Sequence, residues 1–246
     1  MTFDGLLNDS IQYDYVSFIT DELPFQDLPT LMATNKDFQA AGQSVIKTTV
    51  HRLLTAYGLN PERFRALLRQ TGMVLGGYTI LQLLLRHETG SLSLEVFASE
   101  SSPHNGLERL HEELLHAGYE LAEVEDGNAE PARLNALRLR CGIAALREYT
   151  RRSKDRIEGN RINVVIAEHH ASVLTPILHS PTTATMGYLA SDSIHHLYPS
   201  WTFKHVAWRN SSRKTPVVLT EAVKTTDPMT EASAWTYGRQ HVSRLT

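Results

Sequence analysis

The chain has 246 residues, of which 41% are hydrophobic and 21% are charged, and its formal net charge is −3. This composition is typical of a folded globular protein and excludes a disordered, collagen-like or coiled-coil chain. With a pI near 6.5 the sequence also lacks the strongly basic footprint of a dedicated nucleic-acid binder, so no nucleic-acid partner is expected.

Cysteine content and the N-terminal residues bear on the compartment. Cys141 is the single cysteine, which allows no internal disulfide and suits a reducing compartment. The longest apolar stretch, residues 72–85, is shorter than the roughly 20 residues that span a bilayer, so no membrane partner is expected. The first 15 residues contain acidic residues and no basic ones, which is the reverse of a targeting signal. The sequence therefore predicts a cytoplasmic or nuclear protein.

Helices are predicted first along the chain. In residues 13–57 apolar side chains recur three and four positions apart, as at Tyr15, Phe18 and Ile19, which predicts a series of short helices. Asn60 and Pro61 then supply an N-cap and a pre-set first residue for a further helix. Residues 1–70 are thus predicted as a helical N-terminal segment.

The pattern changes at residue 71. Residues 72–75 predict a short buried strand, Gly76-Gly77 a tight turn, and residues 78–86 a helix. Residues 91–96 alternate strictly between polar and apolar side chains, which predicts a strand buried on one face only.

The rest of the chain predicts a mixed α/β unit. His104 or Asn105 would cap a helix that Gly118 ends. Residues 134–149 fit a helix or a strand. Gly159-Asn160 predicts a hairpin turn leading into a central strand over residues 162–166, and residues 173–179 predict a helix. The expected fold class is α/β of the α+β type, with a small mixed-sheet core over residues 71–210 and a C-terminal extension over 211–246.

The order of these elements, with Gly76-Gly77 placed directly before a helix, resembles the nucleotidyltransferase fold of the DNA polymerase beta superfamily, in its divergent branch common in fungal genomes. The resemblance runs from about residue 72 to 203. The later part of those sequences is matched by His179-Ser180, Met186 and Tyr198-Pro199.

This resemblance implies a specific set of catalytic positions. Active members place a serine after the paired glycines, two aspartates one residue apart on the next strand, and a third carboxylate on a later strand. Residues i and i+2 of a strand point the same way, so the two aspartates hold divalent ions against a triphosphate. In this chain the corresponding residues are Tyr78, Ser91, Ser93 and Asn163. Because these residues carry no negative charge, Mg²⁺ binding is not expected, and no other cofactor or metal is predicted.

The first hypothesis is therefore a catalytically silent nucleotidyltransferase-like binding protein whose ligand is a nucleotide or another phosphate-bearing molecule. Backbone N–H groups at the glycine turn and the helix N-terminus would hold the phosphates. The residues expected at this site are Gly76, Gly77, Tyr78, Thr79, Ser91, Ser93 and Asn163.

A second hypothesis is an active enzyme with an unfamiliar arrangement of side chains. Glu95 shares the predicted strand face with Ser91 and Ser93, and Glu168 follows Asn163 by five residues, so these two glutamates and the histidines could carry it. Adjacent histidines on an extended chain point to opposite faces, so each His-His pair would give one metal ligand at most.

A third hypothesis concerns residues 13–54, which look like a divergent F-box, a short helical module that docks on the Skp-type adaptor of a ubiquitin ligase. The motif residues are Leu23-Pro24, Asp27-Leu28-Pro29, Leu31-Met32 and Asn35-Lys36-Asp37-Phe38. This resemblance implies a substrate adaptor with a Skp-type partner. A helical cap packed on the α/β unit explains the same residues.

Overall fold

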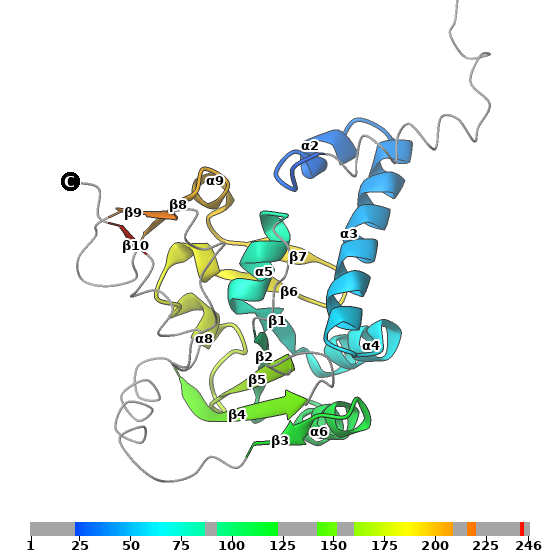
Figure 1. The fold of residues 1–246 in the computed structure, drawn as a ribbon, viewed down its shortest axis with the longest axis vertical. Coiled ribbons are helices and arrows are strands. Elements are labelled where there is room, and N and C mark those ends of the chain that lie inside the picture. Colours follow the sequence, from blue (N-terminus) through cyan, green and yellow to red (C-terminus); the bar gives the residue numbers. More distant parts are fainter. Residues whose placement is uncertain are drawn as a thin grey trace, which may run out of the picture.

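The computed structural model describes residues 23–86, 93–122, 142–151 and 160–208, together with the backbone of two short strands at 216–219 and 242–243. Helices and a mixed sheet pack together in these ranges (Figure 1), which confirms the predicted α+β class. No helix among the described residues combines the length and the apolar character that a membrane span requires.

Three helices precede the sheet: α2 (Leu28–Met32), α3 (Lys36–Ala56) and α4 (Pro61–Thr71). The start of α4 is confirmed as predicted, because the Asn60 side chain accepts a hydrogen bond from the Arg63 N–H and Pro61 is the first helical residue. The prediction of only short helices is wrong for α3, which is one helix of 21 residues. Its length follows from packing, since its apolar side chains lie in the same core as the sheet.

Among the described residues, seven strands form the main sheet in the order β3-β4-β5-β2-β1-β6-β7. Their bounds are β1 (Val74–Gly76), β2 (Leu94–Ser99), β3 (Glu120–Leu121), β4 (Ile143–Arg151), β5 (Asn160–Ala167), β6 (Gly187–Leu189) and β7 (Ile194–His196). β2 and β5 are parallel, and the remaining neighbours pair antiparallel. A separate small sheet holds β8 (Val206–Trp208), β9 (Pro216–Leu219) and β10 (Val242–Ser243).

Two strand predictions are corrected. β2 is not buried on one face only: it lies between β1 and β5 and begins at Leu94, and its Glu95 side chain is almost fully buried. The two-residue hairpin at Gly159-Asn160 is also wrong, because Arg151 pairs with Asn160 and eight residues, 152–159, separate the two strands in the sequence. The central position of the strand that begins at Asn160 is confirmed, and residues 143–149 of the ambiguous stretch form a strand. Residues 134–141 lie outside the described ranges.

The remaining helices are α5 (Gly77–Leu84), α6 (Gly106–His116), α8 (Thr175–Leu178) and α9 (Pro199–Thr202), with a 3₁₀ turn, η1, at Thr183–Thr185. α6 ends shortly before Gly118, as predicted. The predicted side-chain cap is wrong: Asn105 has φ of 54° and its side chain accepts no capping hydrogen bond from the described residues. The helix predicted over residues 173–179 is the four-residue α8.

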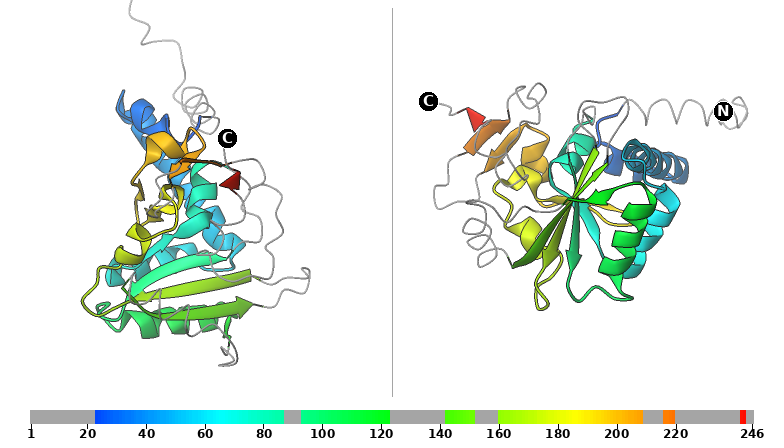
Figure 2. Two further views of the ribbon diagram at one scale, coloured as in Figure 1. Left: turned by 90° about the vertical axis from the view of Figure 1, so that its left-hand side faces the viewer. Right: turned by 60° about the horizontal axis from the view of Figure 1, so that its bottom comes forward.

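The main sheet is covered on two sides. Figure 2 shows α3, α4 and α6 together on one side of it, and α8 with the loops around it on the other. The side chains of Leu75, Val96 and Val164 belong to the larger core cluster, which also holds residues of α3, α4 and α6. Phe97 and Val165 pack with Ile177 of α8 on the opposite face. The N-terminal helices therefore share a hydrophobic core with the sheet.

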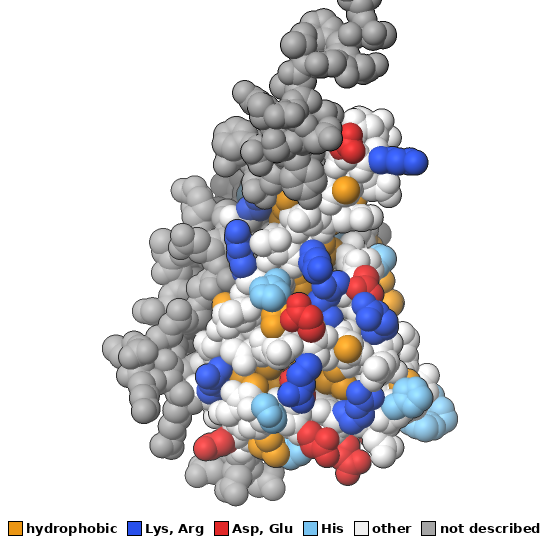
Figure 3. All heavy atoms as spheres, turned by 90° about the vertical axis from the view of Figure 1, so that its right-hand side faces the viewer, with side chains coloured by type: hydrophobic (Ala, Val, Ile, Leu, Met, Phe, Trp, Pro, Cys, Tyr) orange, Lys and Arg blue, Asp and Glu red, His pale blue; other side chains and the backbone are white. Residues whose placement is uncertain are grey.

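Charged side chains on the α3, α4 and α6 side neutralise one another locally. Figure 3 shows Lys and Arg interspersed with Asp and Glu over this face. Arg63 of α4 pairs with Glu113 of α6 at 2.7 Å. Arg65 and Arg69 of α4 both donate hydrogen bonds to Asp192 in the turn between β6 and β7. This face therefore carries charges of both signs and no uniformly basic surface.

Candidate functional site

The site predicted at the paired glycines lies where β1 ends and α5 begins. Gly76 is the last residue of β1, and Gly77, with φ of 72°, is the first residue of α5. This left-handed conformation favours glycine. A Cβ atom at Gly77 would also overlap Glu95 Oε2 and would lie 2.5 Å from Glu95 Cδ. Gly77 is thus required both for the turn and for the close approach of the Glu95 carboxyl.

Glu95 is the most perturbed acid of this region. Its side chain is 4% exposed, and burial raises its pKa from 4.5 to about 8. Among the described residues, none forms a hydrogen bond or an ion pair with its carboxyl group. At neutral pH most molecules therefore carry Glu95 as an uncharged carboxylic acid, directed at the start of α5.

The sheet register places further polar residues beside Glu95. Gly76 of β1, Glu95 of β2 and Asn163 of β5 are directly opposite one another on adjacent strands. Glu148 of β4 is opposite Asn163, and it lies 3.9 Å from Arg161 on the partly exposed edge of this row. Side chains directly opposite in a sheet share a face, so Asn163 separates the buried acid from the ion-paired one.

Two hydroxyl groups complete the polar cluster at the start of α5. Thr79 Oγ1 donates a hydrogen bond to the Ser93 carbonyl at 3.0 Å, and the Tyr57 hydroxyl is hydrogen-bonded to Thr79. Burial raises the pKa of Tyr57 to about 12, and the charge of Glu95 acts in the same direction. Tyr119 fixes the end of α3 by donating its hydroxyl proton to the Tyr57 carbonyl at 2.6 Å.

Tyr57 and Glu148 were missed by sequence reasoning. Tyr57 follows α3 and lies 38 positions before Glu95 in the sequence, so no local motif connects them. Glu148 falls in the stretch whose apolar spacing fits two kinds of element. In the sequence, each of these residues is only a polar group close to the end of an apolar run. Many surface residues have the same pattern, so it does not single out a functional residue.

The remaining predicted nucleotide-binding residues are placed as follows. Tyr78 is partly buried and packs with Leu81 against Ala184 and Ala207. Ser93 contributes its backbone carbonyl to Thr79. Ser91 lies outside the described residues. The structure therefore brings together Gly76, Gly77, Thr79, Ser93 and Asn163 around Glu95.

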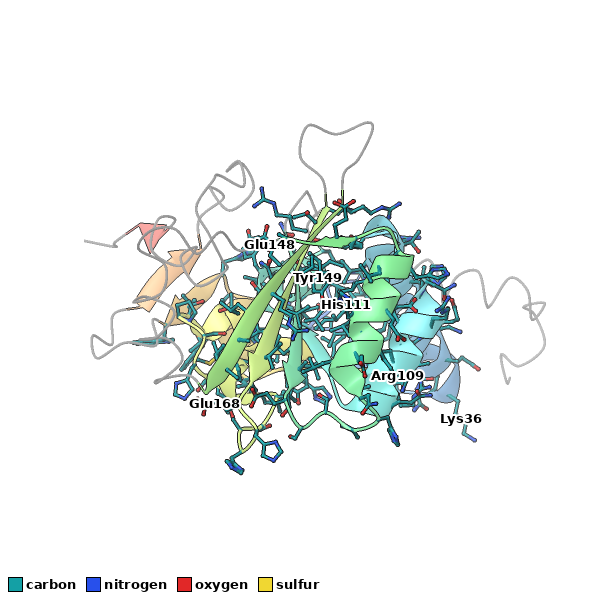
Figure 4. All side chains as sticks on the ribbon, turned by 90° about the horizontal axis from the view of Figure 1, so that it is seen from below. Lys36, Arg109, His111, Glu148, Tyr149 and Glu168 are labelled. Carbon is teal, nitrogen blue, oxygen red and sulfur yellow. The ribbon has the colours of Figure 1, made fainter. Side chains whose placement is uncertain are left out.

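Glu95 and Glu168, the acids of the active-enzyme hypothesis, are not brought together. Asn163 is opposite Glu95, whereas Glu168 follows the end of β5, five residues or roughly 16 Å further along the chain. Figure 4 shows Glu148, which is opposite Asn163, and Glu168 at opposite ends of the β4–β5 pair. Glu168 therefore cannot share a bound ion with Glu95.

The histidine pairs are also separated from this cluster. His169 and His170 follow β5 and form an edge-to-face ring contact at 4.9 Å. His195 stacks on Tyr188, and His196 is hydrogen-bonded to the Ala184 carbonyl. In the described parts of the chain, no three His, Cys, Asp or Glu side chains gather as metal ligands would.

The residues at the start of α5 do not fit a divalent metal ion. Mg²⁺ takes charged carboxylate or phosphate oxygens. Here Ser93 contributes its carbonyl to Thr79, Asn163 offers a neutral amide, and Glu95 is mostly protonated at neutral pH. Among the described residues at this position, the groups available are therefore a hydroxyl, an amide and a mostly uncharged acid.

The F-box-like residues of α2 and α3 are partly engaged in the core. Leu28, Val45 and Leu53 are buried in the cluster that also contains the sheet residues, and Phe25 packs there as well. Residues 13–22 lie outside the described ranges. The arrangement is that of helices packed on the α/β unit.

No protein-family model matches this chain, and neither a curated protein nor a solved structure gives a significant match.

Proposed function

We propose that this protein binds a nucleotide or another phosphate-bearing ligand at the start of α5 and does not catalyse nucleotidyl transfer. The observation that carries the proposal is the Glu95 carboxyl group, buried against Gly77 and without a polar partner among the described residues. A buried acid of this kind costs stability and is common at functional sites. A ligand that supplied a hydrogen-bond partner would remove this cost.

The surroundings of Glu95 support an anionic ligand. α5 points its N-terminus at this cluster, and the first backbone N–H groups of a helix attract anions. At Gly77 the absence of a side chain lets the Glu95 carboxyl group lie against the backbone where the ligand is proposed to bind. The proposal also draws on the nucleotidyltransferase resemblance, which rests on the chain order of a strand, the paired glycines, a helix and two later strands, here β1, α5, β2 and β5.

The lack of nucleotidyl-transfer activity is inferred from the small number of charged carboxylates at the start of α5. Nucleotidyl transfer in that family needs two or three carboxylates that hold metal ions. This cluster contains one acid, Glu95, and it is mostly uncharged at neutral pH. Ser93 and Asn163 occupy other positions at which the resemblance places carboxylates, and neither can supply a charge.

Calorimetric titration tests both halves of the proposal. ATP is expected to bind in the presence of EDTA, whereas adenosine, which lacks the phosphates, is expected not to bind. Gly77→Ala should weaken ATP binding at least tenfold, because the new Cβ enters the space of the Glu95 carboxyl. Gly72→Ala is the matched control, since Gly72 has a similar φ of 68° and no atom near the position of its Cβ.

Two results would contradict the proposal. Equal binding of ATP and adenosine, or no binding of ATP, would remove the phosphate site. Release of pyrophosphate from ATP that depends on Mg²⁺ or Mn²⁺ would remove the catalytically silent interpretation and favour the active-enzyme hypothesis.

A further inference from the structure

We propose that Glu95 contacts the ligand directly as an uncharged carboxylic acid and that its O–H donates a hydrogen bond to a phosphate oxygen held at the start of α5. This inference rests on the function proposed above and adds a proton to the binding reaction. It makes ligand binding at this site dependent on pH, with protons taken up as the phosphate binds.

Geometry carries the first step. The Glu95 carboxyl group lies against Gly77, at the end of α5 where the backbone N–H groups attract an anion. A phosphate oxygen bound by those N–H groups would be a close neighbour of the Glu95 carboxyl group, whose Oε2 lies nearest to the Cβ position of Gly77. Two negative charges at contact distance repel strongly in a buried site, whereas an acid O–H and an anionic oxygen form a strong hydrogen bond. The phosphate therefore selects the protonated form of Glu95.

The groups around Glu95 offer no competing partner. Tyr57, which follows α3, is the titratable group among the described residues that couples electrostatically with Glu95, and it remains uncharged until far above neutral pH. From α5 and β5 the neighbours are the neutral side chains of Thr79 and Asn163, and β1 contributes only Gly76. On the next strand, Glu148 is paired with Arg161. The described residues therefore place no cation beside Glu95 that would hold it in its charged form.

The size of the effect follows from proton linkage. Burial raises the pKa of Glu95 in the free protein to about 8, so the fraction of protein ready to bind falls as the pH rises through this value. Affinity for ATP is then expected to fall about tenfold between pH 7 and pH 9. Binding should take up about half a proton at pH 8 and about nine-tenths of a proton at pH 9.

The test is calorimetric titration of the full chain with ATP in EDTA at pH 7, 8 and 9, each in two buffers of different ionisation enthalpy. The difference in heat between the buffers gives the number of protons taken up. Glu95→Gln keeps an N–H donor at the same place but cannot titrate, so it should bind ATP equally well from pH 7 to pH 9. Both proteins are titrated with the same ATP, so protons exchanged by the phosphates themselves cancel when the proton uptake of Glu95→Gln is subtracted from that of the wild type.

Glu168→Gln is the control for loss of a carboxylate. Glu168 is exposed at the far end of β5, and this variant should show the wild-type proton uptake and the wild-type pH dependence. The affinities of the wild type and of Glu168→Gln at pH 7, 8 and 9 test the pH dependence on their own, whether or not the Glu95 variant folds.

The outcomes separate the two proposals. If ATP binds to the wild type with constant affinity from pH 7 to pH 9, or with the same proton uptake as Glu95→Gln, Glu95 is not a proton donor and this inference is wrong, while the proposed binding function stands. If ATP binds at none of the three pH values, the binding function itself fails, and the role of Glu95 fails with it.

Discussion

Replacement of Glu95 by Gln also changes the stability of the free protein, in a way that depends on pH. Burial raises the pKa of Glu95 from 4.5 to about 8, so between these values the folded protein holds a proton that the unfolded chain has released. Stability is therefore fully present below pH 4.5 and is lost as the pH rises toward 8. At about 1.4 kcal/mol for each pH unit, the interval amounts to about 5 kcal/mol.

Gln has the size of Glu and cannot ionise, so the Glu95→Gln variant does not lose stability through residue 95 as the pH rises. Relative to the wild type, Glu95→Gln is expected to gain about 3 kcal/mol of unfolding free energy between pH 4.5 and pH 7, and about 5 kcal/mol once the pH exceeds 8. The assay is urea denaturation of both proteins at intervals from pH 4.5 to 9, with the m-values compared at each pH. Other titrating groups are present in both proteins and cancel in the difference.

Parallel stability profiles for the wild type and Glu95→Gln would refute the reasoning, because they would mean that Glu95 titrates alike in the folded and unfolded states. A gain of the opposite sign, with the wild type becoming relatively more stable as the pH rises, would mean that an unseen cation holds Glu95 charged. Glu168→Gln serves as the control and should keep the wild-type profile, since its carboxylate is exposed.

Four further substitutions test local packing and ion pairing. Gly77→Ala should lower the unfolding free energy by about 3 kcal/mol and Gly72→Ala by about 1 kcal/mol in thermal denaturation, because both acquire a strained positive φ but only Gly77 lies against another side chain; equal losses would contradict the contact. Gln82 has a buried side-chain oxygen without a hydrogen-bond partner among the described residues, so Gln82→Met should raise stability by about 1 kcal/mol in the same assay, and a loss would indicate an unrecognised partner. A hydrogen bond from Arg69 and a second from Ser191 lower the pKa of Asp192, and the charges of Arg69 and Arg65 act in the same direction, so their contribution is present at neutral pH and lost as the solution becomes more acidic. Asp192→Asn should lower stability by about 1 kcal/mol at neutral pH, and by less in high salt; an effect unchanged by salt would exclude an electrostatic cause.

Local chemistry was sufficient to predict several elements. The start of α4 depends on Asn60 and Pro61, which are adjacent to the helix they begin. The change from strand to helix at Gly76-Gly77 and the end of α6 before Gly118 depend on residues within the same short windows. Each of these signals acts through hydrogen bonds or backbone angles inside one turn, so the remainder of the fold does not alter them.

Two predictions that depended on the packing of neighbouring elements failed. The alternation of residues 91–96 indicates a strand with one solvent-exposed face. In the structure β2 lies between β1 and β5, and its side chains are buried on both faces. The apolar spacing before Tyr57 indicates separate short helices, whereas packing on the sheet stabilises one continuous α3. In both cases the burial that decided the structure comes from residues distant in the sequence.

By itself, the sequence determined the class of the fold, the glycine turn before α5 and the residues that follow it, because those depend on contacts between near neighbours in the chain. Only the tertiary structure decided the character of the site. The parallel register of β2 and β5 places Asn163 beside Glu95, and the end of α3 brings Tyr57 to Thr79. Burial beside these residues raises the pKa of Glu95, since removal from water disfavours the charged form, and at neutral pH Glu95 is therefore mostly an uncharged acid.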